Sequence, residues 1–300
     1  MPGDLFQGMR NEGEASLSQP ADDPVFFGTS SFSELDWVGP FYPSGTSPAD
    51  FLSYYATQFH TVEIDATYYA VPTAKTVDGW RERTPAHFLF SAKFPRAVVH
   101  GGEGSQPDTT NILDSQRALE VTETYLAAIS RLGEKLGMLL IQFPYFNKIA
   151  FKQSGPFLER LDRFLNRLPE GYRYAVEIRN RTWLNETFVE VVRAHGCVLA
   201  LVDHAWMPHG AEIAEQLGAL TNGLGYVRLV GDRAEIEKIT SRWNREVLDK
   251  EESLLRWARL LASVSRSAEK IVVYVNNHFT GYSPATARRL MQMYYKELDG

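Results

Sequence analysis

The sequence predicts a single (β/α)8 barrel of the TIM type, an α/β fold built on eight parallel strands. From residue 25 onward, eight short apolar runs alternate with eight amphipathic stretches, which is the pattern of repeated strand–helix units. The 300 residues give room for such a barrel, which typically needs ~250 residues. An open doubly wound sheet is the main alternative, and it is disfavoured because no Gly-x-Gly-x-x-Gly turn follows the first strand.

The composition is that of an ordinary globular protein, with 44% hydrophobic and 23% charged residues and a formal net charge of -6. This acidic balance disfavours non-specific attraction to nucleic acid or to anionic membranes. No apolar stretch approaches the ~20 residues that cross a bilayer, so no membrane association is expected. Residues 1–24 are polar and lack the apolar segment of a signal peptide. We therefore expect a disordered tail over 1–24, a barrel domain over 25–300 and a cytoplasmic protein.

The expected strands are rich in Val, Ile, Leu and Phe, as strands covered on both faces of a parallel sheet should be. Polar residues, Gly or Pro bound most of them and favour turns at their ends. The strands are expected at residues 25–29, 61–65, 88–94, 137–143, 173–178, 198–203, 225–230 and 271–276.

The first four helices are indicated by their ends and by their periodicity. The first follows Ser47, a good N-cap, and the second stops before Pro85, because a residue that precedes proline disfavours the helical conformation. The third is long and periodic, and the fourth ends before Pro169. These helices are expected at residues 48–58, 73–83, 111–133 and 155–167.

The last four helices show the same kinds of signal. The fifth ends at Gly196, a residue type favoured just beyond a helix C-terminus, and the sixth has the weakest pattern. The seventh places Leu254, Leu261 and further apolar residues on one face, and the eighth opens with Ser283-Pro284. They are expected at residues 185–195, 210–220, 249–268 and 283–298.

Charged residues alternate with apolar ones near the ends of the second and fifth strands. The apolar neighbours are expected to face the helices, which turns Glu63, Asp65, Glu177 and Arg179 into the barrel. Side chains at the C-terminal ends of barrel strands line the mouth, where TIM-barrel active sites lie. The residues expected at this mouth are Glu63, Asp65, Lys93, Gln142, Glu177, Arg179, Asp203, Arg228 and Asn277.

A buried charge is costly unless it is paired or used, so this series has two explanations. Pairs such as Glu63–Lys93 or Glu177–Arg228 could form a closed ion-pair network with only a structural role. Alternatively, the charges line a functional pocket. The number of strand ends that carry a charge on one face favours the pocket.

Aromatic residues also gather just after the expected strand ends. They could form a wall for a flat or sugar-like ligand or stacking platforms for bases, and they could equally pack the loops onto the barrel. Tyr68 and Trp183 are the preferred ligand contacts because they lie closest to the charged pairs. The set comprises Trp37, Phe41, Tyr42, Tyr68, Tyr69, Tyr145, Phe146, Trp183 and Trp206.

Familiar catalytic motifs are missing from the sequence: it has no Walker loop, no His-Glu-x-x-His and no Gly-x-Ser-x-Gly. Three histidines, His100, His204 and His278, fall on the expected mouth side. With Glu63, Glu177 or Asp203 they could bind a divalent metal. Their spacing is dispersed, so the sequence assigns no metal site and leaves any cofactor open.

Taken in order, these strings resemble the YecE-like family, catalogued as domain of unknown function 72. The resemblance runs from about Phe27 to Leu290. The matching pieces include Gly28-Thr-Ser-Ser31, Trp37-Val-Gly-Pro-Phe41-Tyr-Pro43, Phe51-Leu-x-Tyr-Tyr55, Val62-Glu-Ile-Asp-Ala-Thr-Tyr-Tyr69, Phe90-Ser-Ala-Lys93, Gln142-Phe-Pro144, Val176-Glu-Ile-Arg179 with Trp183, Val227-Arg-Leu229 and Asn276-Asn-His278.

The resemblance implies a TIM-like barrel, and the family has no settled activity. A suggested likeness of the family to barrels of the endonuclease IV type makes DNA or phosphate ligands worth considering. Two positions depart from the family's pattern. Val99 precedes His100 where Thr is usual, and Val230 follows Arg-Leu where His is usual, which weakens a metal site at the seventh strand.

The sequence leaves three functions open. The first is a hydrolase acting on a phosphate-containing substrate, with Glu63 and Glu177 as general acid and base and with Lys93, Arg179 and Arg228 holding the anion. The second is a non-catalytic protein that binds a metabolite or nucleic acid, the latter disfavoured by the net charge. The third is a glycoside hydrolase with Glu63 and Glu177 as its carboxylate pair. The oligomeric state is not determined by the sequence.

Overall fold

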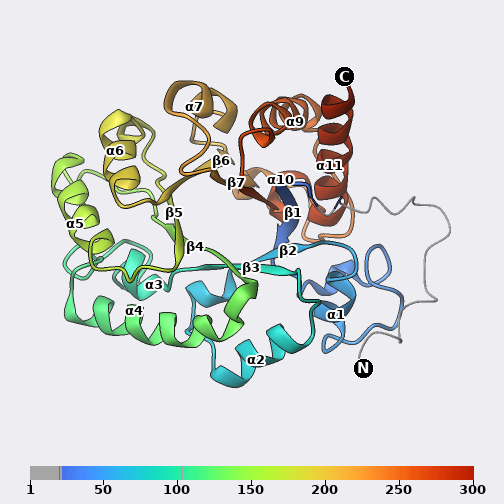
Figure 1. Ribbon diagram of the computed structural model, residues 1–300, viewed down its shortest axis with the longest axis horizontal. Helices are drawn as coiled ribbons and strands as arrows, with labels where there is room; N and C mark the ends of the chain where they lie inside the picture. Colours follow the sequence, from blue (N-terminus) through green and yellow to red (C-terminus); the bar gives the residue numbers. More distant parts are fainter. Residues whose placement is uncertain (1–19, 21, 103) are drawn as a thin grey trace.

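The chain forms a closed barrel of parallel strands in the order β1-β2-β3-β4-β5-β6-β7-β8, with helices around it (Figure 1). In this computed structural model, residues 20, 22–102 and 104–300 are described. Because β8 pairs with β1, the sheet has no open edge, and the predicted fold is confirmed. The strands are β1 (Val25–Ser30), β2 (Thr61–Ile64), β3 (Leu89–Lys93), β4 (Leu136–Gln142), β5 (Arg173–Glu177), β6 (Val198–His204), β7 (Leu224–Gly231) and β8 (Lys270–Val275).

One main helix follows each strand in the described part of the chain. These helices are α1 (Phe51–Tyr55), α2 (Ala74–Glu82), α4 (Gln116–Ile129), α5 (Gly155–Leu165), α6 (Glu186–Ala194), α7 (Gly210–Leu217), α9 (Glu251–Ser265) and α11 (Ser283–Asp299). Shorter helices lie in the loops after β3, β7 and β8: α3 (Arg96–Val99), α8 (Arg233–Ile236) and α10 (Asn277–Thr280). Four 3-10 turns complete the set within the described residues: η1 (Leu35–Trp37), η2 (Ala66–Tyr68), η3 (Ser130–Lys135) and η4 (Arg181–Trp183).

Several element boundaries differ from those that the sequence predicts. The first helix is shorter and begins at Phe51. The third begins only at Gln116, because the Ser115 hydroxyl accepts a hydrogen bond from the Ala118 amide at 3.1 Å and caps the helix there. The second strand ends at Ile64, so Asp65 precedes the turn η2. These shifts leave the order of elements unchanged, and they decide how the residues at the mouth are presented.

Two separate sets of apolar side chains pack against the two faces of the barrel wall. The larger set fills the layer between strands and helices and includes Val62, Ile64 and Val176. The smaller set fills the inside of the barrel. It comprises Met138, Leu140, Ala175, Val198, Ala200, Leu224, Tyr226, Val272 and Tyr274, with Phe26 packed against it. Membership of the inner set shows directly which alternate residues of a strand point into the barrel.

Hydroxyl groups join the strands inside the barrel above the inner apolar set. The Tyr274 hydroxyl lies 2.8 Å from the Ser91 hydroxyl and 2.7 Å from that of Thr61, and all three residues are buried. Since a buried hydroxyl without a partner is costly, this chain of hydrogen bonds stabilises the packing of β2, β3 and β8.

Asp23, which precedes β1, connects the N-terminal end of the barrel to α11 by hydrogen bonds. Its two carboxylate oxygens accept hydrogen bonds from the hydroxyls of Tyr294 and Tyr295 at 3.0 and 2.7 Å. The predicted tail, residues 1–24, otherwise lies outside the described residues except for residue 20 and residues 22–24. Within the described chain, no helix combines the length and the apolar character needed to cross a bilayer.

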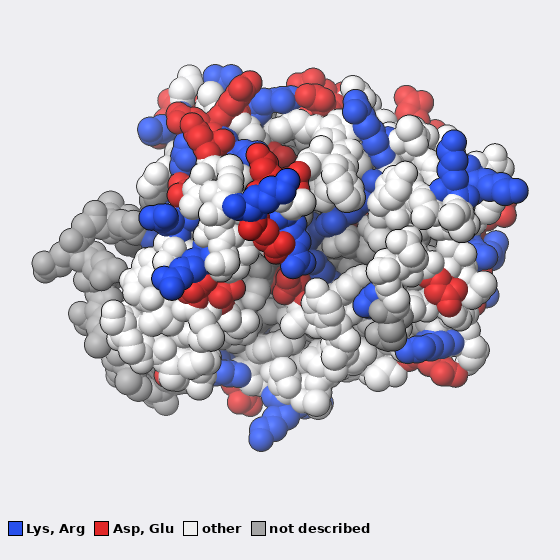
Figure 2. All heavy atoms as spheres, turned by 180° about the vertical axis from the view of Figure 1, so that it is seen from behind, with Lys and Arg blue, Asp and Glu red and all other residues white. Residues whose placement is uncertain are grey.

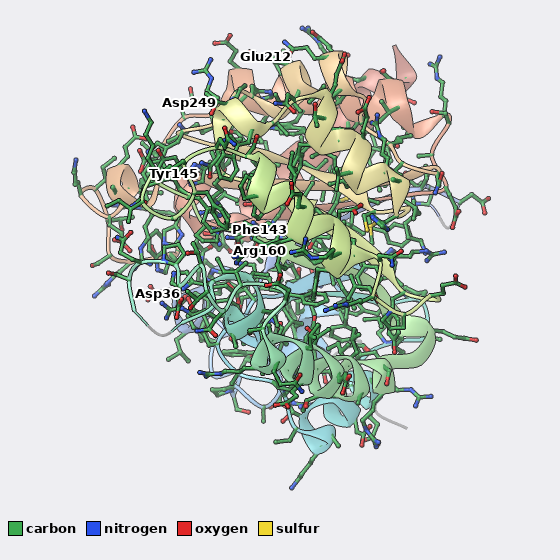
Figure 3. The ribbon with its side chains drawn as sticks, turned by 90° about the vertical axis from the view of Figure 1, so that its left-hand side faces the viewer. Asp36, Phe143, Tyr145, Arg160, Glu212 and Asp249 are labelled. Atoms are coloured by element: carbon green, nitrogen blue, oxygen red, sulfur yellow. The ribbon has the colours of Figure 1, made fainter. Side chains whose placement is uncertain are left out.

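The C-terminal ends of the strands share one face of the molecule. Asp36, Tyr145 and Asp249 follow β1, β4 and β7, and Figure 3 shows all three on the same side. Figure 2 shows this face from the front: it is hollowed near its centre, and side chains of both charges gather there. This mouth is the part of the barrel where the sequence analysis places a site.

Candidate functional site

Three fully buried charged residues form a closed cluster just below the mouth. The Arg228 guanidinium binds both oxygens of Glu63, with its Nε and Nη2 atoms each 2.8 Å from the carboxylate. Its Nη1 atom lies 2.5 Å from Oε2 of Glu177. Arg228 is 1% exposed and both glutamates are 0% exposed. We call Glu63, Arg228 and Glu177 the buried triad.

Two further donors complete the triad. The Tyr226 hydroxyl donates to Glu63 Oε2 at 2.7 Å, and Arg179 Nε donates to Glu177 Oε1 at 2.9 Å. All four carboxylate oxygens therefore accept a charged or hydroxyl donor. The strands explain this arrangement, because β2, β5 and β7 each turn every second residue inward and closure of the barrel brings them together.

Both triad carboxylates are held in the ionised form. Burial alone raises the pKa of Glu177, but the charges of Arg228 and Arg179 outweigh it and lower this pKa to about 2. For Glu63 the opposing effects of burial and of Arg228 also leave the pKa below its ordinary value. An ionised, shielded carboxylate is a poor general acid. The geometry holds Glu63 and Glu177 in place through all four carboxylate oxygens, and the catalytic roles that the sequence suggested stay a prediction.

Lys93 and Asp65 lie above the triad and differ from it in having no close side-chain partner. Both residues are half-buried. Among the described residues, no ion pair engages the Lys93 ammonium, and the Asp65 carboxylate is hydrogen-bonded to its own main chain but to no other side chain. Burial raises the pKa of Asp65, although the charge of Lys93 opposes this. Burial and then the charge of Arg228 lower the pKa of Lys93. Both shifts favour the neutral form of the group relative to the same group in water.

Arg179 is only partly engaged. Its side chain is 21% exposed, and Nε is bound to Glu177. Its two terminal nitrogens have no partner among the described residues. Two parallel N–H donors at the rim of a mouth are the arrangement that binds carboxylate or phosphate in bidentate fashion.

The sixth strand turns His204 into the mouth, and this corrects the expectation for Asp203. Val198 and Ala200 belong to the inner apolar set, so the same alternation brings His204 inward and Asp203 outward. Asp203 accordingly contacts α9, where its Oδ2 atom accepts hydrogen bonds from Ser253 at 2.5 Å and from Trp257 at 3.1 Å.

The Asn277 side chain binds the start of α11, which differs from the expectation that it faces the mouth. Asn277 is the first residue of α10, and its Oδ1 atom accepts hydrogen bonds from the amide and hydroxyl of Ser283 at 3.0 and 2.8 Å. Its preceding neighbour, Asn276, caps α10. Gln142, by contrast, ends β4 in phase with Leu140 of the inner set, as expected.

The two preferred aromatic residues have different surroundings. The Trp183 ring packs on Phe146, Phe151 and Phe157, with ring centroids 5.9, 6.2 and 5.5 Å away. This cluster holds the loop after β5 against α5, as the loop-packing alternative supposed. Tyr68 is half-buried, and burial raises its pKa while the charges of Arg96 and Arg179 oppose the rise. Tyr68 therefore lies among the cations of the mouth.

A comparison with known proteins gives the family. The family model described as "Protein of unknown function DUF72" matches residues 26–299, nearly the whole described chain. The chain is a member of the DUF72 family. The YecE-like resemblance inferred from the sequence motifs is thus confirmed.

Relatives of this DUF72 protein occur in several bacteria. The UPF0759 protein YunF of Bacillus subtilis is 23% identical over 92% of this chain and 96% of its own length. The UPF0759 protein YecE of Escherichia coli is 28% identical, and the match spans 64% of this chain and 65% of YecE. A DUF72 crystal structure from Thermotoga maritima has 27% identity and a TM-score of 0.66, covering 92% of this chain and 99% of that one.

Two mouth residues of the DUF72 protein, Arg96 and Ser30, were not expected from the sequence, and a third, His204, was expected at the mouth only as a possible metal ligand. Arg96 follows β3 directly and lies near Tyr68. His204 ends β6. Ser30 ends β1 in phase with Phe26, is 8% exposed, and its hydroxyl has no partner among the described residues. The sequence could indicate Arg96 and His204, because both lie at or just after the end of a strand. It could not indicate Ser30, because the sequence does not show that a serine hydroxyl lacks a partner.

The three histidines considered as metal ligands have separate local contacts. His100 Nδ1 lies 3.1 Å from the Gly102 carbonyl, and the His278 ring packs on Trp243. His204 Nδ1 accepts a hydrogen bond from the Trp206 amide at 3.3 Å. Across residues 20, 22–102 and 104–300, no group of three His, Cys, Asp or Glu side chains is arranged to hold a metal ion.

His204 is expected to make the protein less stable in mild acid. Burial and then the charge of Arg179 lower its pKa from 6.5 to about 4. Because the unfolded chain takes up a proton below pH 6.5 and the folded chain does so only near pH 4, stability falls as the pH decreases between these values. We expect His204→Gln to flatten this part of the curve of melting temperature against pH. The exposed His87→Gln variant is the control, and an identical response of both variants would contradict the role of His204.

Proposed function

We propose that the mouth of the barrel binds a small phosphate-containing ligand and that the protein acts on it as a hydrolase. The observation that carries the proposal is the partnerless positive charge at the rim. Among the described residues, the Lys93 ammonium and the two terminal nitrogens of Arg179 have no partner, while the carboxylates below them are already bound.

The two cations suit different parts of an anion. Arg179 is held by Glu177 through Nε, so its remaining N–H groups are fixed in direction and can donate to two phosphate oxygens. Lys93 supplies a compact positive charge with three donors. The Glu63 and Glu177 carboxylates do not repel the ligand strongly, because Arg228 neutralises part of their charge.

Asp65 is the candidate proton-transfer group of the proposed hydrolase. It is half-buried at the mouth, and no other side chain among the described residues binds its carboxylate. Its raised pKa, caused by burial, brings proton exchange closer to neutral pH than is usual for aspartate. In this proposal Asp65 takes the place that the sequence analysis gave to Glu63 or Glu177.

The buried triad weighs against the glycoside-hydrolase alternative. That chemistry needs one carboxylic acid with a raised pKa to protonate the leaving group. Glu63 and Glu177 have lowered pKa values, are fully buried and share one guanidinium. A non-catalytic binding protein remains the alternative, and only the detection of a hydrolysis product distinguishes it from the proposed enzyme.

Substitution of Arg179 by glutamine is expected to weaken phosphate binding. Hydrogen bonds to charged groups contribute about 1.5–3 kcal/mol, so the dissociation constant measured by calorimetry should rise by roughly 10- to 100-fold. Lys93→Met should have an effect of the same direction, because it removes the second cation.

Arg173→Gln is the matched control for this experiment. Arg173 begins β5, the same strand after which Arg179 lies, and pairs with Glu269 on the exposed opposite end. The control should bind phosphate as the parent protein does. Equal losses in Arg173→Gln and Arg179→Gln would show that the effect is one of overall charge and would contradict a site at the mouth.

A further inference from the structure

We propose that Lys93 is a nucleophilic amine that forms a Schiff base with a small aldehyde or ketone at the mouth. The juxtaposition that supports it is a lysine without an ion-pair partner, set above a triad whose carboxylates are fully engaged. The Asp65 carboxylate, which no other side chain binds among the described residues, lies above the same triad and acts electrostatically on Lys93. We expect the carbonyl compound to carry an anionic group that Arg179 binds. This expectation alone rests on the function proposed above, and the Schiff base itself does not.

The position of Lys93 on β3 makes its amine available. Lys93 is the last residue of the strand and follows the inward alternation of Ser91, whose hydroxyl bonds with Tyr274 inside the barrel. Lys93 is half-buried, and it lies at the mouth end of its strand. In the described chain no carboxylate oxygen lies within ion-pair distance of its ammonium.

The triad explains why Lys93 forms no ion pair with Glu63 or Glu177, although both carboxylates act on it electrostatically. Arg228 and Arg179 occupy Glu177, and Arg228 with Tyr226 occupies Glu63. A buried guanidinium beside a lysine disfavours the ammonium form, as does partial burial. Both effects lower the pKa of Lys93, against the opposing charges of Glu63, Asp65 and Glu177. A larger share of the amine is therefore neutral and nucleophilic than in water.

The reaction balances with groups already present. The neutral Lys93 amine adds to the carbonyl carbon, and a proton moves from nitrogen to oxygen to give a carbinolamine. The protonated Asp65 carboxyl then donates its proton to the carbinolamine hydroxyl, which leaves as water while the nitrogen lone pair forms the C=N bond. The products are a protonated imine, one water and the Asp65 carboxylate. No oxidant or reductant is needed.

Other lysines with lowered pKa values lack this setting. The Lys135 ammonium donates to the carbonyl oxygens of Arg81 and Thr84 at 2.6 Å each, so its lone pair is not available. Lys270 is half-buried at the opposite end of the barrel, where its ammonium lies 5.6 Å from the centre of the Phe26 ring. Lys270 is thus a second half-buried lysine, outside the mouth, with which Lys93 can be compared.

Borohydride trapping tests the proposal. The full-length protein is incubated with glyoxylate and sodium borohydride, which converts an imine into a stable secondary amine, and peptide mass spectrometry locates the adduct. A positioned acid typically contributes ~10²-fold or more. We therefore expect initial labelling of Lys93 to exceed that of Lys270 by about this factor. Asp65→Asn should remove most of the advantage while leaving Lys270 unchanged, and Lys93→Arg should abolish the mouth adduct while preserving the melting temperature.

Several outcomes separate this inference from the proposed phosphate site. Even labelling of Lys93 and Lys270, or an Asp65→Asn variant labelled like its parent, would overturn the nucleophile. Acetaldehyde is the uncharged counterpart of glyoxylate. Selective labelling of Lys93 by both aldehydes at equal rates, together with no phosphate binding, would support the nucleophile and overturn the anion site. Phosphate binding that depends on Arg179, without selective labelling of Lys93, would support the anion site and overturn the nucleophile.

Discussion

Replacing Arg228 with methionine is expected to destabilise the protein by roughly 3–5 kcal/mol. The substitution removes one guanidinium that binds two fully buried carboxylates, Glu63 and Glu177. Glu177 would keep Arg179, but Glu63 would retain only the Tyr226 hydroxyl. Glu63, left buried with one neutral donor, and Glu177, left with one guanidinium instead of two, must then either take up protons or destabilise the barrel. Urea denaturation at neutral pH measures the loss, and acid should partly restore stability because protonation neutralises both groups.

A triple variant tests whether the triad acts through charge or through shape. Arg228→Met combined with Glu63→Gln and Glu177→Gln removes all three charges while keeping similar volumes. Since replacement of a whole buried ion network is often neutral or stabilising, the triple variant should recover most of the stability lost in the single one. An Arg228→Met protein as stable as its parent would contradict the buried triad, and a triple variant as unstable as Arg228→Met would show that packing dominates.

Gly231→Ala is expected to be the second large effect, costing more than about 2 kcal/mol of stability. Gly231 ends β7 with a φ of +75°, a conformation that L side chains rarely adopt. A Cβ atom there would lie 2.3 Å from the His278 carbonyl oxygen and 2.6 Å from the Phe279 Cα atom. These are main-chain atoms of α10 that cannot turn aside. The packing of α10 against β7 at the mouth should loosen, which thermal unfolding would detect.

Gly171→Ala is the matched control for the steric part of this effect. Gly171 has a φ of +89°, but nothing lies within 4 Å of the position that its Cβ would take. It should therefore show only the conformational cost of about 1–2 kcal/mol. If Gly231→Ala were no worse than Gly171→Ala, the close contact between β7 and α10 would not matter for stability.

The sequence predicts which residues of a strand point into the barrel where charged residues alternate with apolar ones. Around Glu63 and Glu177, apolar and charged residues alternate, and the structure turns both glutamates inward. Arg228 follows the same rule. A charge cannot lie against the helix layer at low cost, so the alternation alone determines which face is which.

The phase of β6 and β8 could not be predicted in this way. Both strands are apolar on consecutive positions, because the residues inside the barrel and those under the helices are equally buried. The sequence therefore gave no reason to prefer His204 over Asp203, or Asn276 over Asn277. The structure decides it through neighbours: Val198 and Ala200 pack inside, and Ser253 and Trp257 of α9 bind Asp203 from outside.

The order of eight strand–helix units and the charge at the strand ends were determined by the sequence itself, since periodicity and desolvation act locally along the chain. The complete set of charge pairs was decided by closure of the barrel. The sequence suggested Glu177 with Arg228, which the structure confirms, and Glu63 with Lys93, whereas Arg228 also reaches Glu63 from β7 and leaves Lys93 without an ion-pair partner among the described residues. Pairing across a barrel depends on strand tilt and register, which bring together residues far apart in the sequence, so the availability of Lys93 is a property of the tertiary structure alone.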